Sequence, residues 1–133
     1  MPKKPTVRSL KRTADRLFSE IIRRSSINEF GWVFCVTCKK PDLWQNMDCG
    51  HYESRKHNNT RYDKRNCAPQ CRTCNRFEEG RKYEFGKYLV EKYGEEIIEE
   101  LRTLAYTNKR FTVSELQEMI KQFKLELEEI KNV

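Results

Sequence analysis

Four cysteines form two identical Cys-x-x-Cys pairs, which is the most specific pattern of reactive side chains in this 133-residue sequence. The first pair is Cys35 and Cys38, and the second is Cys71 and Cys74. One such turn presents two thiolates to a metal ion, and two turns complete the tetrahedral shell that Zn²⁺ prefers. The sequence therefore predicts a structural zinc site. Because four thiolates leave no ligand position open, this zinc should take no part in a reaction.

The expected compartment favours zinc over disulfides. The first residues, MPKKPTVRSLKR, are basic and polar, and they lack the apolar stretch of an export signal. We therefore expect a reducing cytoplasm, where Cys-x-x-Cys pairs are metal ligands before they are disulfides. We expect no membrane span, because no apolar run approaches the roughly 18 residues that one needs. The other cysteines, Cys49 and Cys67, should be small buried apolar side chains.

A second group of polar residues lies between and just after the cysteine pairs. His51 stands between the pairs, Asn66 precedes the second pair, and Asn75 directly follows its last cysteine. If His51 ends a strand and Asn75 begins the next helix, a hairpin held by zinc would bring them together. His57 lies in a cationic stretch, where contact with a nucleic acid or with solvent is more common than metal binding.

An amphipathic, basic helix is expected within residues 1–30, starting at Pro5-Thr6 and followed by Gly31 as the end of the segment. Its apolar residues recur at helical spacing and are typical of a core-facing stripe, and its other faces carry cations that could hold phosphates. The stripe consists of Leu10, Ala14, Leu17 and Ile21, widened by Phe18 and Ile22.

The middle of the chain, residues 31–94, should contain two short strands within 32–52, a polar loop over 53–70 and a helix from Arg72 to about Tyr93. The helix could break near one of its two glycines, Gly80 or Gly86, because glycine costs about 1 kcal/mol inside a helix.

Residues 95–133 should form a short helix over 95–106 and a long one that begins at Ser114, with Gln117 completing a capping box. The long helix carries a narrow apolar seam made of Leu116, Ile120, Phe123, Leu127 and Ile130. Two helices pair along such a seam. This one would serve either a second subunit or the chain's own core.

The net charge of +7 is concentrated in residues 1–82, whereas residues 83–133 are net negative. This asymmetry favours a polyanion-binding face, although solubilising surface charge would look the same. Seven cations surround the histidine and asparagines and could hold phosphates: Arg55, Lys56, Arg61, Lys64, Arg65, Arg72 and Arg76. About half of them could equally be solvated surface residues.

One string of motifs resembles a known family. Gly50-His51-Tyr52, Arg55, Arg61-Tyr62-Asp63, Asn66, Gln70-Cys71-x-x-Cys74-Asn75 and Gly80 are similar to the NinG/Rap proteins of lambdoid phages, over residues 35 to about 104. These belong to the HNH, or ββα-metal, nucleases. The resemblance implies an α+β fold with a zinc-stapled, treble-clef-like ββα-metal core over 31–94. The basic helix and the C-terminal seam fall outside it.

The resemblance also implies an activity. The family suggests a metal-dependent endodeoxyribonuclease that cuts branched recombination intermediates, such as Holliday junctions and D-loops, by recognising DNA shape. A homodimer is expected because a four-way junction is cut by paired sites, and the cytoplasm would be that of a bacterial host if a phage encodes the chain. The alternatives are a non-catalytic zinc-stapled DNA-binding module and a recombination adaptor that docks through its acidic tail.

Site roles follow from the same resemblance. His51 would be the general base, Asn75 a ligand of the catalytic Mg²⁺ or Mn²⁺, and Asn66 the residue whose amide holds the loop that orients the histidine. Many members place an acidic residue or histidine directly before the base, where this chain has Gly50. The favoured remaining ligand is Asp48, provided that a bulge at Cys49-Gly50 turns it toward His51. The alternatives are two acids on the helix face of Asn75, of which Glu79 is preferred to Glu78.

Overall fold

The computed structural model describes residues 3–132, which fold into an α+β body. Its helices are α1 (Val7–Arg24), α2 (Asn58–Arg61), α3 (Lys82–Tyr93), α4 (Ile97–Ala105) and α5 (Val113–Lys131). Its strands are β1 (Val33–Phe34), β2 (Pro41–Asp42), β3 (Met47–His51) and β4 (Cys67–Cys71). Short helical turns occupy Trp44–Asn46, Lys64–Asn66, Thr73–Phe77 and Glu79–Arg81. None of the described helices is both long and apolar enough to cross a membrane.

The centre of the fold is the antiparallel pair β3–β4, in which Met47 lies opposite Cys71 and His51 opposite Cys67. The expected polar loop over 53–70 is therefore wrong in its last residues, which form β4. This strand could not be predicted from the sequence pattern. Its residues, Cys-Ala-Pro-Gln-Cys, include none that is β-branched, and apolar and polar positions do not alternate because the first four residues are all buried.

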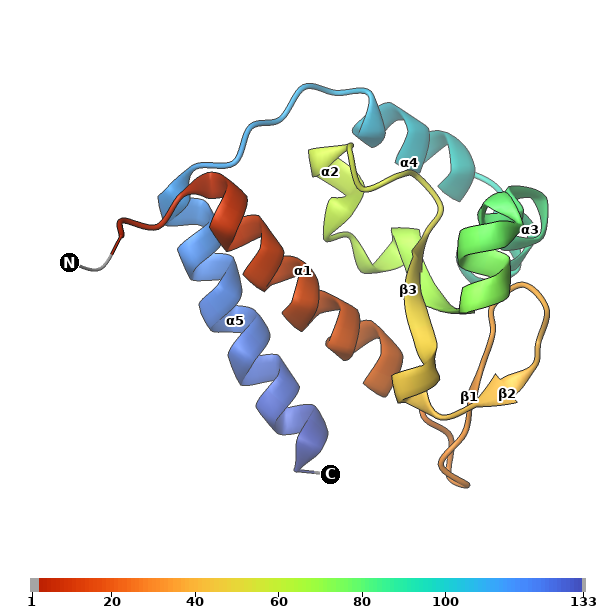
Figure 1. Ribbon diagram of the computed structural model, residues 1–133. Coiled ribbons are helices and arrows are strands. Elements are labelled where there is room, and N and C mark those ends of the chain that lie inside the picture. The colour runs from red at the N-terminus through yellow and green to blue at the C-terminus, as the bar shows by residue number, and fades with distance from the viewer. Residues whose placement is uncertain (1–2, 133) are drawn as a thin grey trace.

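Helical layers cover both sides of this strand pair (Figure 1). On one side, Phe18 and Ile22 of α1 pack against Cys67. On the other side, Ala68 packs into a cluster with side chains of α3 and α4, among them Phe85 and Leu101. The N- and C-terminal helices thus pack together beside β3–β4.

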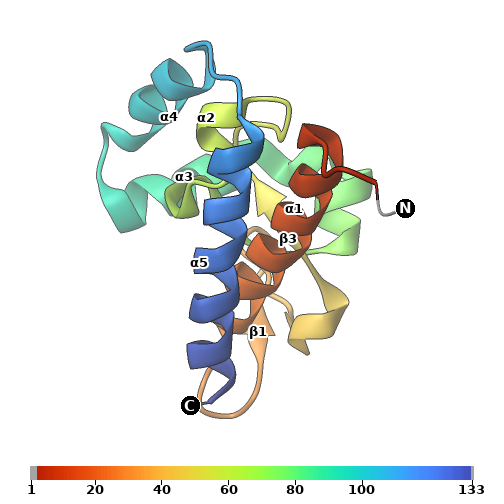
Figure 2. The same ribbon diagram turned by 90° about the vertical axis from the view of Figure 1, so that its left-hand side faces the viewer.

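The seam of α5 is filled by α1, beside which it runs in the same direction (Figures 1 and 2). Ile120 and Leu127 share a cluster with Ala14, Leu17 and Ile21 of α1, and Phe123 and Ile130 pack on its edge. Of the two roles that the seam left open, the structure shows packing within the chain. Ile120 and Leu127, which are 8% and 5% exposed, are buried by this packing.

Helix termini differ in detail from those expected. Helix α1 starts where expected, with Thr6 as its N-cap, but it ends at Arg24, well before Gly31. Helix α5 begins at Val113 because Thr112, and not Ser114, accepts a hydrogen bond from the Glu115 amide at 3.1 Å. Threonine and serine are both preferred N-cap residues, so the residue types alone did not identify Thr112 as the cap.

The helical segment after Cys71 is interrupted at Gly80, one of the two glycines considered. Gly80 has a left-handed φ of 74°, which glycine adopts without a steric cost. The chain resumes as α3 at Lys82, and Gly86 lies inside that helix against the ring of Tyr52.

Replacing Leu127 by alanine should lower the free energy of unfolding by about 2–4 kcal/mol, because the cavity would lie between α1 and α5. Leu125→Ala on the same helix is the matched control, since Leu125 is 51% exposed and should change stability by less than about 0.5 kcal/mol. Urea unfolding measures both. Equal effects of the two substitutions would contradict the packing of the seam on α1.

Candidate metal centre and active-site cavity

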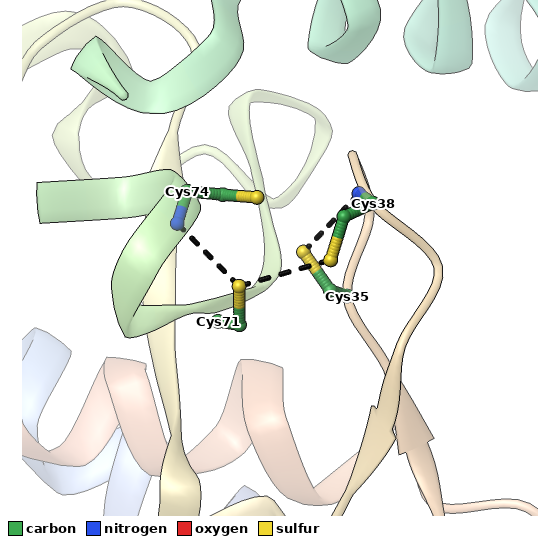
Figure 3. Close-up of side chains that lie close together, drawn as sticks. All are labelled: Cys35, Cys38, Cys71 and Cys74. Carbon is green, nitrogen blue, oxygen red and sulfur yellow. Dashed lines mark hydrogen bonds between the residues drawn. The ribbon is translucent and has the colours of Figure 1, made fainter. Parts of the chain in front are cut away.

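The four cysteines of the two Cys-x-x-Cys pairs come together as predicted, with their sulfur atoms within 4.8 Å of one another. Cys35 and Cys38 lie in the loop between β1 and β2, Cys71 ends β4, and Cys74 lies in the turn that follows. Figure 3 shows the sulfurs pointing toward one another, and those of Cys38 and Cys71 are 3.8 Å apart. This cluster could hold a zinc ion, which would tie the β1–β2 loop to the end of β4.

Backbone amides prepare the cluster for thiolates. The N–H of Cys38 donates to the sulfur of Cys35 at 3.5 Å, and the N–H of Cys74 donates to that of Cys71 at 3.4 Å. Burial opposes ionisation of Cys35, yet hydrogen bonds from backbone groups lower the pKa of this thiol to about 6. Burial raises the pKa of Cys71 to about 12, so a bound cation would have to displace its proton.

A cavity of about 630 Å³ opens between α1, β3 and the Thr73–Phe77 turn. Its lining includes three of the residues that the sequence singled out, namely His51, Asp48 and Asn75. His51 is the last residue of β3, and Asn75 lies in the turn directly after the second cysteine pair, so the cysteine cluster fixes one wall of the cavity.

Asp48 is the carboxylate that lies beside Asn75, whose Nδ2 donates to its Oδ2 at 3.0 Å. The guanidinium of Arg76 binds the same carboxylate through two hydrogen bonds of 2.9 Å. Burial raises the pKa of Asp48, but the hydrogen bonds from Arg76 and Asn75 outweigh it and the net effect is a lowered pKa. Asp48 is therefore an anion at neutral pH.

Asp48 lines the cavity without the bulge that was expected at Cys49-Gly50. Strand β3 pairs residue for residue with β4 throughout. Gly50 faces away from the cavity toward Gln70, and a Cβ atom at position 50 would lie 2.4 Å from the Gln70 Oε1 atom. A side chain directly before His51 therefore has no room.

The alternative acids, Glu78 and Glu79, are not among the residues that line this cavity. Their predicted place on one helix face with Asn75 is wrong, because the turn that carries Asn75 ends at Phe77 and Glu79 has a left-handed φ of 52°. The run Phe-Glu-Glu-Gly is compatible with a helix in sequence, and the structure shows that the helical path is broken at Glu79 and Gly80.

His51 is held by a backbone carbonyl, with its Nε2 atom 3.0 Å from the oxygen of Arg61. Because a carbonyl oxygen only accepts, Nε2 carries the proton and Nδ1 keeps the lone pair. Burial lowers the pKa of His51, and the Arg61 carbonyl offsets this only in part. The ring is therefore neutral at neutral pH, with one nitrogen able to accept a proton.

The loop that carries Arg61 is fastened by the buried side chain of Asn66. Its Nδ2 donates to the carbonyls of Glu53 at 2.9 Å and Thr60 at 3.1 Å, and its Oδ1 accepts from the Glu53 amide at 2.8 Å. These are the loop contacts that were expected of Asn66. Through Thr60 and its neighbour Arg61, they set the position of the carbonyl that binds His51.

The predicted phosphate-binding cations divide into two groups. Arg55, Arg72 and Arg76 line the cavity. The other four lie elsewhere, and three of them are held by carboxylates of the chain: Arg61 binds Asp15, Lys64 binds Glu126, and Arg65 binds Asp63 and Glu100, whereas Lys56 lies near His57 in a different surface hollow. His57 itself packs on the ring of Tyr106, with centroids 4.8 Å apart.

Helix α1 adds to the cavity one of the cations that the sequence suggested could hold phosphates. Arg23 lines the cavity, its Nε donates to the Ser19 hydroxyl at 3.0 Å, and its guanidinium lies over the Trp44 ring at 5.0 Å. Within residues 3–132, neither Arg23 nor Arg72 forms a salt bridge to a carboxylate. Nothing in the sequence separates Arg23 from the other cations of α1, since only packing decides which face meets β3.

The leftover cysteines differ in their surroundings. Cys67 is buried, as expected, and burial raises the pKa of its thiol well above the usual value. Cys49 is only half-buried and lines the cavity beside His51. All six cysteines of the chain carry free thiols.

Removal of zinc with a chelator, or the substitution Cys38→Ser, should lower the Tm by at least about 10 °C, because the ion would join segments that otherwise have few contacts. Cys49→Ser is the control and should keep the zinc of the four-cysteine cluster. Metal content and thermal unfolding are the measurements. If the chain purifies without zinc and the chelator leaves its Tm unchanged, a structural zinc is ruled out.

Substituting Asn66 by alanine should destabilise the chain by about 2–4 kcal/mol, since three hydrogen bonds are lost and buried backbone groups are left unpaired. Asn59→Ala removes one hydrogen bond to the Thr107 carbonyl in a more exposed place, and should cost less than about 1 kcal/mol. Chemical unfolding compares the two. Similar losses would show that Asn66 does not fasten the loop.

Comparisons with known proteins bear on nearly the whole chain. A family model described as "Bacteriophage Lambda NinG protein" matches residues 3–132. The match includes α1 and α5, which were expected to fall outside the resemblance. Two curated proteins named "Protein ninG", from Escherichia phage 933W and Enterobacteria phage VT2-Sa, are each 26% identical over 99 residues, or 74% of this chain and 48% of the relative. The chain thus spans about half the length of these relatives.

No solved structure matches the chain. The family match, in contrast, covers almost every residue, including the four clustered cysteines, His51, Asp48 and Asn75. The protein therefore belongs to the bacteriophage NinG family.

Proposed function

We propose that this protein is a metal-dependent endonuclease that hydrolyses phosphodiester bonds of branched DNA, with β3, β4 and the Thr73–Phe77 turn as its HNH, or ββα-metal, unit. The observation that carries the proposal is the shared cavity, which is lined by a neutral imidazole, an anionic carboxylate, an amide and several arginines. The individual residue types are common, but their combination is what phosphodiester hydrolysis needs.

His51 is the general base. Its Nε2–H is fixed on the Arg61 carbonyl, so Nδ1 accepts the proton of a water molecule that attacks phosphorus. The lowered pKa keeps this nitrogen unprotonated at neutral pH. Asn66 acts as a positioning residue, because it fastens the loop that presents the carbonyl.

Asp48 and Asn75 are the ligands of the catalytic ion. A carboxylate and an amide carbonyl are oxygen donors of the kind that Mg²⁺ and Mn²⁺ take, so the residues fit such an ion. When bound, the ion would replace Arg76 as the partner of the Asp48 carboxylate and stabilise the leaving 3′ oxygen. We therefore expect cleavage to depend on metal.

Arg23, Arg55 and Arg72 hold the phosphates on either side of the scissile bond. They line the cavity from α1, from the loop after β3 and from the end of β4, so they meet a strand from different directions. Contacts to phosphates carry no base information, which favours recognition of DNA shape. If a four-way junction is cut by two copies, those copies would meet through a surface other than the α1–α5 seam.

The test is incubation with a labelled four-way junction and a matched linear duplex in Mg²⁺ or Mn²⁺. The unmodified protein should cut the junction in preference to the duplex, and His51→Ala should lower the rate by about 10²- to 10⁴-fold while junction binding persists. Zinc content and Tm of each variant confirm its fold. Binding without any metal-dependent product would instead favour a non-catalytic DNA-binding module.

The carboxylate is tested with a pair of isosteric substitutions. Asp48→Asn should reduce cleavage at least about 100-fold and raise the Mn²⁺ concentration that gives half-maximal rate, because it removes the charge that attracts the ion. Glu79→Gln removes the same charge outside the cavity and should cut normally. The reverse pattern would assign the ligand to Glu79.

A further inference from the structure

A second group of soft metal ligands lies on the β3–β4 pair, apart from the four clustered cysteines. The Cys49 sulfur, a ring nitrogen of His51 and the Cys67 sulfur all lie within 4.8 Å of one another, the same limit that the four-cysteine cluster meets. Cys49 and His51 are two residues apart on β3 and so share a face, and Cys67 is the β4 residue directly opposite His51. The strand register therefore assembles the group.

His51 is oriented as a metal ligand would be. Metal-binding imidazoles commonly donate their other N–H to a backbone carbonyl, which fixes the tautomer, and here Nε2 is 3.0 Å from the Arg61 carbonyl oxygen. Arg61 is itself held by Asp15, whose Oδ1 accepts from the Arg61 Nε at 2.8 Å. The nitrogen with a free lone pair is thus Nδ1.

The group has a buried side and an open side. Cys67 is 6% exposed and packs with Phe18 and Ile22 of α1, whereas Cys49 and His51 line the cavity. Two thiolates and one imidazole, with a fourth position open to solvent, form a ligand set that zinc accepts. Mg²⁺ and Mn²⁺ prefer the oxygen donors of Asp48 and Asn75, so hard and soft ions would select different residues in the same cavity.

We propose that Cys49, His51 and Cys67 form a second site, which binds a thiophilic divalent ion such as Zn²⁺ or Cd²⁺. Binding replaces the two thiol protons and uses the Nδ1 lone pair of His51. The consequence rests on the proposed nuclease function: a histidine whose Nδ1 is coordinated cannot accept a proton from water. A soft ion at this site would therefore switch cleavage off without displacing the hard ion.

The binding arm of the test needs no nuclease activity. Purified zinc-containing protein is titrated with Cd²⁺, and total zinc plus cadmium per chain is measured together with the cadmium–thiolate absorption. The unmodified chain should hold one more thiophilic ion than the double variant Cys49→Ser/Cys67→Ser. His51→Gln should weaken binding of this extra ion at least about tenfold.

Cys49→Ser alone guards against misfolding of the double variant, since Cys49 is at the cavity surface and Cys67 is buried. It should lose the extra ion while keeping the Tm and the ion of the four-cysteine cluster. An equal ion count in the unmodified chain and in Cys49→Ser would overturn the proposal.

The inhibition arm adds micromolar Zn²⁺ or Cd²⁺ to cleavage reactions at constant Mg²⁺. The soft ion should lower the cleavage rate of the unmodified protein at least about tenfold. It should leave the cleavage rate of Cys49→Ser unchanged. The arms separate the two proposals. An extra ion without any cleavage activity would refute the nuclease and keep the site, whereas cleavage without an extra ion would refute the site alone.

Discussion

The pairing of β3 with β4 is the constraint on which the rest of the molecule depends. These strands are short, and an isolated two-stranded hairpin is at best marginally stable in water. Three supports hold the pair: α1 with α5 on one side, α3 with α4 on the other, and the four-cysteine cluster at the Cys71 end. The cavity residues sit at the edges of this pair, so each support also positions the candidate chemistry.

Buried hydrogen bonds carry this order into the loop after β3, whose Tyr62 also packs against the α1–α5 core. Residues 53–66 contain almost no aliphatic side chains, and they are arranged around the amide of Asn66. A polar network of this kind is costly when incomplete and specific when complete. It turns a flexible sequence into a support for the Arg61 carbonyl and hence for the His51 ring.

Part of the site could be predicted from the sequence because it depends on patterns among neighbouring residues. The clustering of the cysteines, the start of α1 and its apolar stripe follow from patterns within a few residues, and the structure agrees with them. Features that depend on distant packing were not readable. Helix α1 covers the apolar seam of α5, Asp15 of α1 pairs with Arg61, and Arg23 reaches the cavity only because of the face that α1 turns to β3.

The tight contact between Gly50 and Gln70 links two positions across the strands. Gln70 spans the gap by donating from Nε2 to Thr37 Oγ1 at 3.1 Å and to the Gly80 carbonyl at 2.7 Å, and so it occupies the volume that a side chain at position 50 would need. A relative with a larger residue before its histidine must then carry a smaller or differently placed residue opposite. The two positions should covary among homologues, exchanging bulk from one strand to the other.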